Sequence, residues 1–183
     1  MRNKLITVPQ RRRREGKTNY LSRRKMLTGK KPRLIVRKRG RTIIAQVVSF
    51  TPTGDKTHVN VSSKQLSKLG WEYHAANTPA AYLTGYLAGK EALKQGVKEA
   101  VLDLGMQESS SKLFAVLKGA ADAGLQVPHD EAVLPNEDRI SGEHISGLAD
   151  KALSKSQFAM LKDKKALSKM KESVQTIKTK LDK

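Results

Sequence analysis

Residues 33–50 read RLIVRKRGRTIIAQVVSF, and the rest of the expected fold extends outward from this stretch. Two segments rich in β-branched residues, 33–38 and 41–50, lie on either side of a turn that contains Gly40. β-Branched side chains favour strands, and glycine readily adopts the backbone angles of a tight turn. The spacing therefore predicts an antiparallel hairpin.

The next residues continue the sheet and then become helical. The turn sequence TPTGD at 51–55 precedes an alternating segment at 58–61, which predicts a third antiparallel strand. Ser62 and Gln65 have the spacing of a capping box. They predict a short helix that ends near Gly70.

Helix and strand signals alternate further along the chain. Thr78 followed by Pro79 is typical of a helix start, with Thr78 as the N-cap, and we expect this helix to run to about residue 95. Gly85 and Gly89 on it form a G-x-x-x-G pattern, which predicts close packing of the helix on the sheet. The remaining expected elements are a buried strand at 97–104, a helix at 112–123 and a short strand at 125–127. This order predicts an α/β domain with a mixed sheet and helices on its faces.

The last part of the chain has a different composition. We expect residues 135–145 to form an ordered surface segment without regular structure. From about residue 148 the composition shifts to Lys, Ser, Leu and Met, and apolar residues recur at spacings of three and four. These residues are Leu167, Met170, Val174, Ile177 and Leu181, with Met160 one heptad earlier. The stripe predicts an amphipathic helix, which is open to four interpretations: a docking helix, a coiled-coil strand, an RNA-surface helix, or a basic tail that orders only in an assembly.

Charge is distributed unevenly along the chain. Residues 1–41 hold 17 Lys or Arg and one acid, residues 42–149 hold 9 and 12, and residues 150–183 hold 10 and 4. The formal net charge of the whole chain is +19. A strongly cationic head on a nearly neutral body predicts a polyanionic partner, with nucleic acid favoured over an anionic membrane surface. We therefore divide the chain into a basic arm with a short helix at 1–31, an α/β domain at 32–147 and a basic helical extension at 148–183.

The arm has a composition suited to RNA. Its four adjacent arginines at 11–14 repel one another, and we expect no regular structure over residues 1–17 alone. Thr18 is expected to cap a helix that runs to Thr28. Guanidinium groups bind phosphate oxygens through paired hydrogen bonds, and a basic face of the hairpin would continue that surface. The predicted RNA contacts are Arg11, Arg12, Arg13, Arg14, Lys17, Asn19, Tyr20, Arg23, Arg24, Lys25, Arg33, Arg37, Arg39 and Arg41. The alternatives are a solvated tail or a targeting signal for the arm, and ordinary solvent-facing charge for the hairpin.

Catalytic and metal-dependent functions find little support. The absence of cysteine excludes disulfides, thiolate zinc sites and cysteine nucleophiles. The histidines at 58, 74, 129 and 144 lack the spacing of metal ligands. Asp103 lies in an expected core strand, but the first strand supplies no second acid for two-metal chemistry, so we expect Asp103 to be structural. We predict no catalytic residue, metal or cofactor, and a cytosolic protein without a membrane partner.

Several long stretches resemble one family of ribosomal proteins. They are RRRREGKTNY at 11–20, NTPAAYLTGYLAGK at 77–90, EAVLDLG at 99–105, LFAVLKGAADAG at 113–124 and RISGEHI at 139–145. With shorter matches between them, they cover residues 5–147 in order. On these residues the chain resembles the large-subunit ribosomal protein eighteen family, the universal 5S rRNA-binding ribosomal protein, in its archaeal and eukaryotic form.

The resemblance implies a fold, a place and a set of partners. The implied fold is a three-layer α/β domain with ribonuclease-H-like topology and no nuclease activity. The implied function is structural: the protein holds 5S rRNA against the large-subunit (23S-type) rRNA in the central protuberance of the cytoplasmic ribosome. Neighbouring ribosomal proteins, including the ribosomal protein five family, are further implied partners. Carried over by position, the RNA contacts are Arg11 to Arg14, Lys17, Tyr20, Arg23 and Arg24. The residues beyond Gly147 match no part of the family, so their partner stays open.

Two other functions remain as alternatives at this point. One is a divalent-metal nuclease on the same scaffold, which the number of carboxylates on the core strands would distinguish from an RNA-binding protein. The other is a module that oligomerises through its C-terminal helix, which the association state of the protein would reveal.

Overall fold

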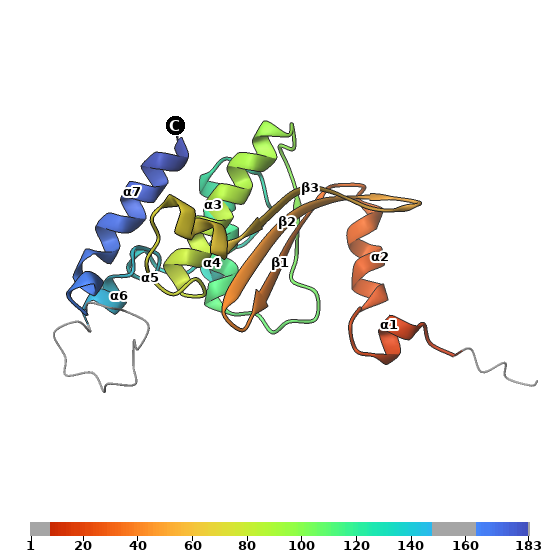
Figure 1. The fold of residues 1–183 in the computed structure, drawn as a ribbon. Helices are drawn as coiled ribbons and strands as arrows, with labels where there is room; N and C mark the ends of the chain where they lie inside the picture. The colour runs from red at the N-terminus through yellow and green to blue at the C-terminus, as the bar shows by residue number, and fades with distance from the viewer. Residues whose placement is uncertain (1–7, 148–163, 183) are drawn as a thin grey trace, which may run out of the picture.

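A four-stranded mixed sheet lies at the centre of the molecule (Figure 1). The computed structural model describes residues 8–147 and 164–182. The strand order is β3-β2-β1-β4, with β1 antiparallel to β2, β2 antiparallel to β3, and β1 parallel to β4. The strands are β1 (Arg33–Arg39), β2 (Thr42–Thr51), β3 (Gly54–Ser62) and β4 (Val101–Asp103). The predicted α/β class and mixed sheet are confirmed, and the ribonuclease-H-like topology stays a prediction.

The expected hairpin at 33–50 is present, with β1 and β2 paired from Arg33 opposite Val48 to Arg39 opposite Thr42. β3 begins earlier than predicted. Pairing resumes directly after a two-residue turn, with Gly54 opposite Thr51, so the TPTGD sequence contributes to the strands as well as to the turn.

The edge of the sheet at β4 is shorter than predicted. Only three residues of the expected strand at 97–104 are a regular strand. The expected strand at 125–127 is wrong as a regular element, because this segment makes a single parallel bridge between Glu99 and Gln126. An apolar run is compatible with both a strand and an extended loop, and only the available backbone partners separate the two.

The two faces of the sheet carry different neighbours (Figure 1). The helices α3 (Thr78–Lys94) and α4 (Ser111–Asp122) cover one face, onto which β1 projects the fully buried Leu34 and Val36. The alternate residues Ile35 and Arg37 project to the opposite face, where they line a groove with residues of the N-terminal arm. The arm contains α1 (Arg11–Arg14) and α2 (Tyr20–Thr28).

Glycines let α3 and α4 approach each other closely. A Cβ atom on Gly85 would lie 2.0 Å from the carbonyl oxygen of Val116, and one on Gly119 would lie 2.1 Å from that of Tyr82. A Cβ on Gly89 would meet Ala120 of α4 and Ala123, the residue that follows this helix. The close packing predicted for the G-x-x-x-G pattern is therefore present, but the expected partner was wrong: it is α4 and not the sheet.

Asparagines, and not the expected threonines, cap α3 and α2. Asn77 accepts a hydrogen bond from the amide of Ala80 at 2.8 Å, so α3 begins at Thr78 instead of being capped by it. In the same way, Asn19 caps α2 in place of Thr18. Asparagine is among the residues preferred at this position, because its side-chain oxygen reaches a free amide of the first helical turn.

Residues 135–145 are mostly helical, which corrects the prediction of an irregular segment. α5 covers Glu137–Ser141 and α6 covers Glu143–Ser146, with Gly142 between them at a φ of 82°. Each helix is about one turn long, too short for an apolar period to be visible in the sequence. The described 3-10 helices are η1 (Ser63–Leu69), η2 (Glu131–Val133) and η3 (Lys164–Lys169).

The C-terminal helix α7 (Met170–Asp182) packs against α3 and joins the hydrophobic core. The predicted stripe is confirmed: four of its members are buried and one packs partly buried against the core. Met160 lies outside the described residues. Of the four interpretations, docking on the domain is the one observed, and a stripe buried within its own chain is closed to a coiled-coil partner.

Candidate nucleic-acid interface

The first helix in the described part of the cationic head is the single turn α1, where the sequence predicted no regular structure. All four of its arginines are exposed. Glu15 offsets part of their repulsion, since its carboxylate lies 3.5 Å from Arg11 Nε and 2.7 Å from Lys17 Nζ. Arg12 Nε donates to Thr18 Oγ1 at 2.8 Å. This bond ties the turn to the segment that leads into α2.

α2 lies against the open face of the sheet without burying any residue. Its Arg23 donates through Nη2 to both carboxylate oxygens of Asp55, at 3.0 and 2.9 Å. A groove between the arm and the sheet also includes Met26 and Met106. It brings together six of the predicted RNA contacts: Arg12, Lys17, Asn19, Arg23, Arg33 and Arg37.

Six other predicted contacts are exposed to solvent. They are Arg13 and Arg14 of α1, Arg24 and Lys25 of α2, and Arg39 and Arg41 at the β1–β2 turn, all of them exposed. Within residues 8–147 and 164–182, none of these six side chains has a hydrogen-bond or ionic partner. Every guanidinium or ammonium donor on them is therefore available to a phosphate oxygen.

Arg33 and Arg37 are instead engaged by carboxylates, those of Asp103 on β4 and Asp55 on β3. The Arg33 side chain is 1% exposed, and its two terminal nitrogens donate to Asp103 and Asp55, each at 2.8 Å. Arg37 donates to the Asp103 carboxylate at 3.1 Å and to its carbonyl oxygen at 2.7 Å. Asp103 also accepts from the amide of Gly105 at 2.8 Å. Asp103 is structural, as predicted, and Arg33 is placed away from solvent.

Asp55 was not among the site residues predicted from the sequence. Within TPTGD it resembled an ordinary turn residue, and its pairing with Arg23 and Arg33 depends on how α2 and β1 meet in space. Burial alone would raise the pKa of the Asp55 carboxyl. The hydrogen bonds and charges of the two guanidinium groups together lower it by more, so the pKa lies below its ordinary value. The carboxylate is therefore ionised at neutral pH.

Two of the predicted contacts, Asn19 and Tyr20, lie at the start of α2. The Asn19 side chain accepts hydrogen bonds from the amides of Leu21 and Ser22, which occupies its oxygen at the start of α2. Tyr20, the first residue of α2, is partly exposed. Its ring is thus accessible for stacking.

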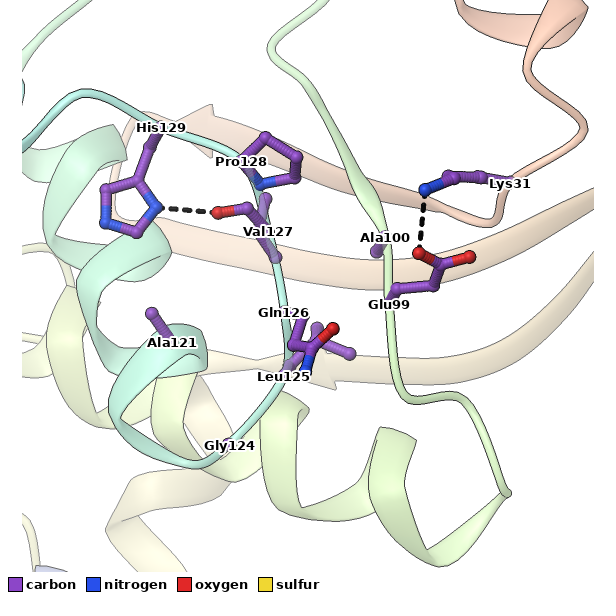
Figure 2. A pocket seen from close by; sticks show the side chains of 10 residues that line it. All are labelled: Lys31, Glu99, Ala100, Ala121, Gly124, Leu125, Gln126, Val127, Pro128 and His129. Atoms are coloured by element: carbon purple, nitrogen blue, oxygen red, sulfur yellow. Dashed lines mark hydrogen bonds and ion pairs between the residues drawn. The ribbon is translucent and has the colours of Figure 1, made fainter.

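A second hollow lies beside β4, on a different part of the surface (Figure 2). Lys31 and Glu99 form an ion pair of 2.7 Å at its rim, and His129 Nδ1 lies 2.6 Å from the carbonyl oxygen of Val127. The remaining lining is largely apolar, as in Leu125. These titratable groups are engaged with neighbours and do not converge on a common point in Figure 2.

Residues 8–147 and 164–182 contain neither a metal-binding cluster nor a membrane-spanning helix. Within these ranges, no three histidine or acidic side chains are grouped so that they could hold a metal ion. In the same part of the chain, no helix has the length and apolar character needed to span a bilayer.

Comparison with known proteins adds to this geometry. The family model described as ribosomal large subunit proteins 60S L5 and 50S L18 matches residues 4–99. Large ribosomal subunit protein uL18 of Methanothermobacter thermautotrophicus is 56% identical over 142 residues, or 76% of this chain and 74% of that protein. The chain belongs to the uL18 family.

Two further uL18 relatives agree. The protein of Thermofilum pendens is 51% identical over 78% of this chain and 74% of its own length. That of Korarchaeum cryptofilum is 52% identical over 77% of this chain and 73% of its own. Membership of the uL18 family confirms the predicted class, a structural protein of the large ribosomal subunit in the cytoplasm and not an enzyme.

Proposed function

We propose that this uL18-family protein binds 5S rRNA and attaches it to the large-subunit rRNA in the central protuberance, beside a member of the ribosomal protein five family. The observation that carries the proposal is a set of six exposed cations on α1, α2 and the β1–β2 turn, none of which has a partner among the residues that the structure describes. A folded chain that left so many donors unused would gain little stability from them. They are available for phosphates.

The arrangement suits recognition of RNA shape. Phosphate contacts position a protein on nucleic acid but carry no base information, so a surface built from arginines follows the path of the backbone. The arm at 1–31 supplies most of the proposed contacts, and the α/β domain at 32–147 adds those of the β1–β2 turn. Arg33 and Asn19 leave the contact set, because one is buried and the other caps α2. The other twelve predicted residues remain.

A titration tests 5S rRNA binding directly. Full-length protein is titrated against a 5S rRNA transcript and against an unrelated structured RNA of equal length, at several salt concentrations. We expect the 5S transcript to bind at least about 100-fold more tightly, since specific contacts add to the electrostatic attraction that every RNA exerts. Equal affinity for the two RNAs would reduce the protein to a non-specific polyanion binder.

Attachment to the large-subunit rRNA needs a bridging assay. Immobilised 5S rRNA is incubated with labelled large-subunit rRNA, with and without the protein. We expect retention of the labelled RNA only when the protein is present. Binding of 5S rRNA without any such retention would limit the function to 5S rRNA alone.

A further inference from the structure

The attachment of α2 to the sheet is unusual for a helix. Helices in globular proteins are normally held by an apolar stripe, but α2 buries no residue and its Leu21 is 64% exposed. Met26 and Leu27 are only partly buried. The hydrogen bonds from Arg23 to Asp55 are the specific polar link between this helix and the sheet among the described residues.

The carboxylate of Asp55 is also bonded to a buried residue of the sheet. Arg33 donates to the same carboxylate at 2.8 Å, and Arg33 is in turn bonded to Asp103 within the core. The side chains of Arg33 and Asp103 are 1% and 6% exposed, so this end of the network is rigidly packed. The Asp55 side chain, 29% exposed, is thus oriented toward α2 by a buried partner. The chain of contacts runs from the core, through Asp55, to the arm.

We propose that Asp55 is a positioning residue of the RNA interface, which anchors α2 and the arginine-rich turn before it on the sheet in advance of RNA binding. The inference rests on the proposed RNA-binding function. Arg12 and Thr18 join the turn to the helix, so anchoring α2 also restricts α1. A preordered cationic surface binds more tightly because less conformational entropy is lost on contact.

This role makes a prediction opposite to that of simple electrostatics. Asp55 is an acid among the cations of the interface, so removing its charge raises the attraction of the surface for phosphate. If Asp55 only neutralised Arg23, Asp55→Asn would bind RNA more tightly. If Asp55 anchors the arm, the same substitution releases α2, and binding becomes weaker despite the gain of one positive charge.

The experiment compares full-length wild type, Asp55→Asn and the matched control Glu72→Gln. Glu72 is an exposed acid, and within the described residues it has no hydrogen-bond or ionic partner. Affinity for the 5S rRNA transcript is measured over a salt series, and amide hydrogen exchange is followed in the RNA-free proteins. Exchange in α2 reports the anchor, and exchange in β2 reports the integrity of the core.

We expect Asp55→Asn to bind about tenfold more weakly, with faster exchange in α2, unchanged exchange in β2 and an unchanged salt slope. Glu72→Gln is expected to match the wild type or bind slightly more tightly. Wild-type or tighter binding by Asp55→Asn, or unchanged exchange in α2, would overturn the proposal. If Asp55→Asn also loses exchange protection in β2, the core itself is disturbed, and Arg23→Gln takes the place of that variant. Arg23→Gln leaves Arg33 paired with Asp55 and is expected to speed exchange in α2. Unchanged exchange in α2 of Arg23→Gln would overturn the proposal. A wild-type protein that ignores 5S rRNA would refute the proposed function, while the exchange data would still decide whether Asp55 anchors α2.

Discussion

The two ends of this chain are both basic, yet they are attached to the domain in different ways. Residues 1–41 carry 17 basic residues against one acid, and residues 150–183 carry 10 against 4. α2 at the first end buries nothing, whereas α7 at the second buries Met170, Val174 and Ile177. An excess of positive charge therefore does not tell whether a terminal segment belongs to the interface or to the core. The presence of an apolar helical period indicates that a terminal segment packs on the core.

The cations themselves have different uses at the two ends. Lys178 donates to the Tyr82 hydroxyl at 3.1 Å and lies 5.3 Å from the ring centre of Tyr86, and Lys180 donates to the Leu69 carbonyl at 3.0 Å. Burial and a hydrogen bond to an aspartate raise the pKa of Tyr82, so its hydroxyl stays protonated. These tail lysines stabilise the fold. The unpaired cations of the head leave their donors to a partner.

The largest expected difference between the two ends is in stability. Ile177→Ala should lower the free energy of unfolding by about 2 to 5 kcal/mol, because it leaves a cavity between α7 and the core. Leu21→Ala on α2 should change it by no more than about 0.5 kcal/mol, since that side chain is in solvent. Urea unfolding of both variants measures the contrast, and similar losses would contradict it.

The next difference is in RNA binding. Replacing Arg13 and Arg14 with glutamine removes two free cations, and we expect the log–log salt slope of RNA binding to fall by about 1.4 to 1.8. The matched variant replaces Lys171 and Lys180, which are bonded within the chain. Its slope should stay that of the wild type. Anisotropy titrations provide both slopes, and an equal fall in both would erase the distinction between head and tail.

The smallest effect concerns the ion pair between α6 and α7. The hydrogen bond and the charge of Lys171 lower the pKa of Glu143 in the folded protein. The pair therefore contributes stability above the unfolded pKa of the carboxyl, and this contribution is lost as the pH falls through the folded pKa. Glu143→Gln should melt slightly below the wild type at neutral pH, and the difference should shrink as the pH falls below the unfolded pKa of the carboxyl and through its lower folded pKa. Because the pair is exposed, high salt should also remove the difference, and a gap that persisted in acid would rule out this origin.

Local patterns predicted most of the elements. The β-branched hairpin, the helices at α3 and α4 and the spacing of the α7 stripe were all correct, because each depends on neighbouring residues. The short helix expected after Ser62 is present as the 3-10 helix η1, with Ser62 accepting a hydrogen bond from the amide of Lys64. The errors occurred where a choice among partners was needed. Thr78 and Asn77 are both good caps, Gly89 fits a sheet or a helix, and a segment such as 125–127 becomes a strand only if enough backbone is opposite it.

The candidate site followed the same division. The number of arginines and their position ahead of the domain were visible in the sequence, and so was the class of partner. The different environments of Arg33, which is buried, and Arg39, which is exposed, were not visible in the sequence, although both residues belong to one strand. Both side chains project to the same face of β1, so the position of the Asp55 and Asp103 carboxylates beside Arg33 determines that Arg33 is the buried and paired one.

Sequence alone determined the composition-dependent properties of this protein: an α/β domain, a cationic head suited to RNA, and an amphipathic C-terminal helix. These follow from short-range periodicity and from charge, which need no coordinates. The tertiary structure decided which cations are free and which are neutralised, and what each apolar stripe covers. The physical reason is that burial and ion pairing are properties of groups brought together from distant parts of the chain, such as Arg23, Asp55 and Asp103.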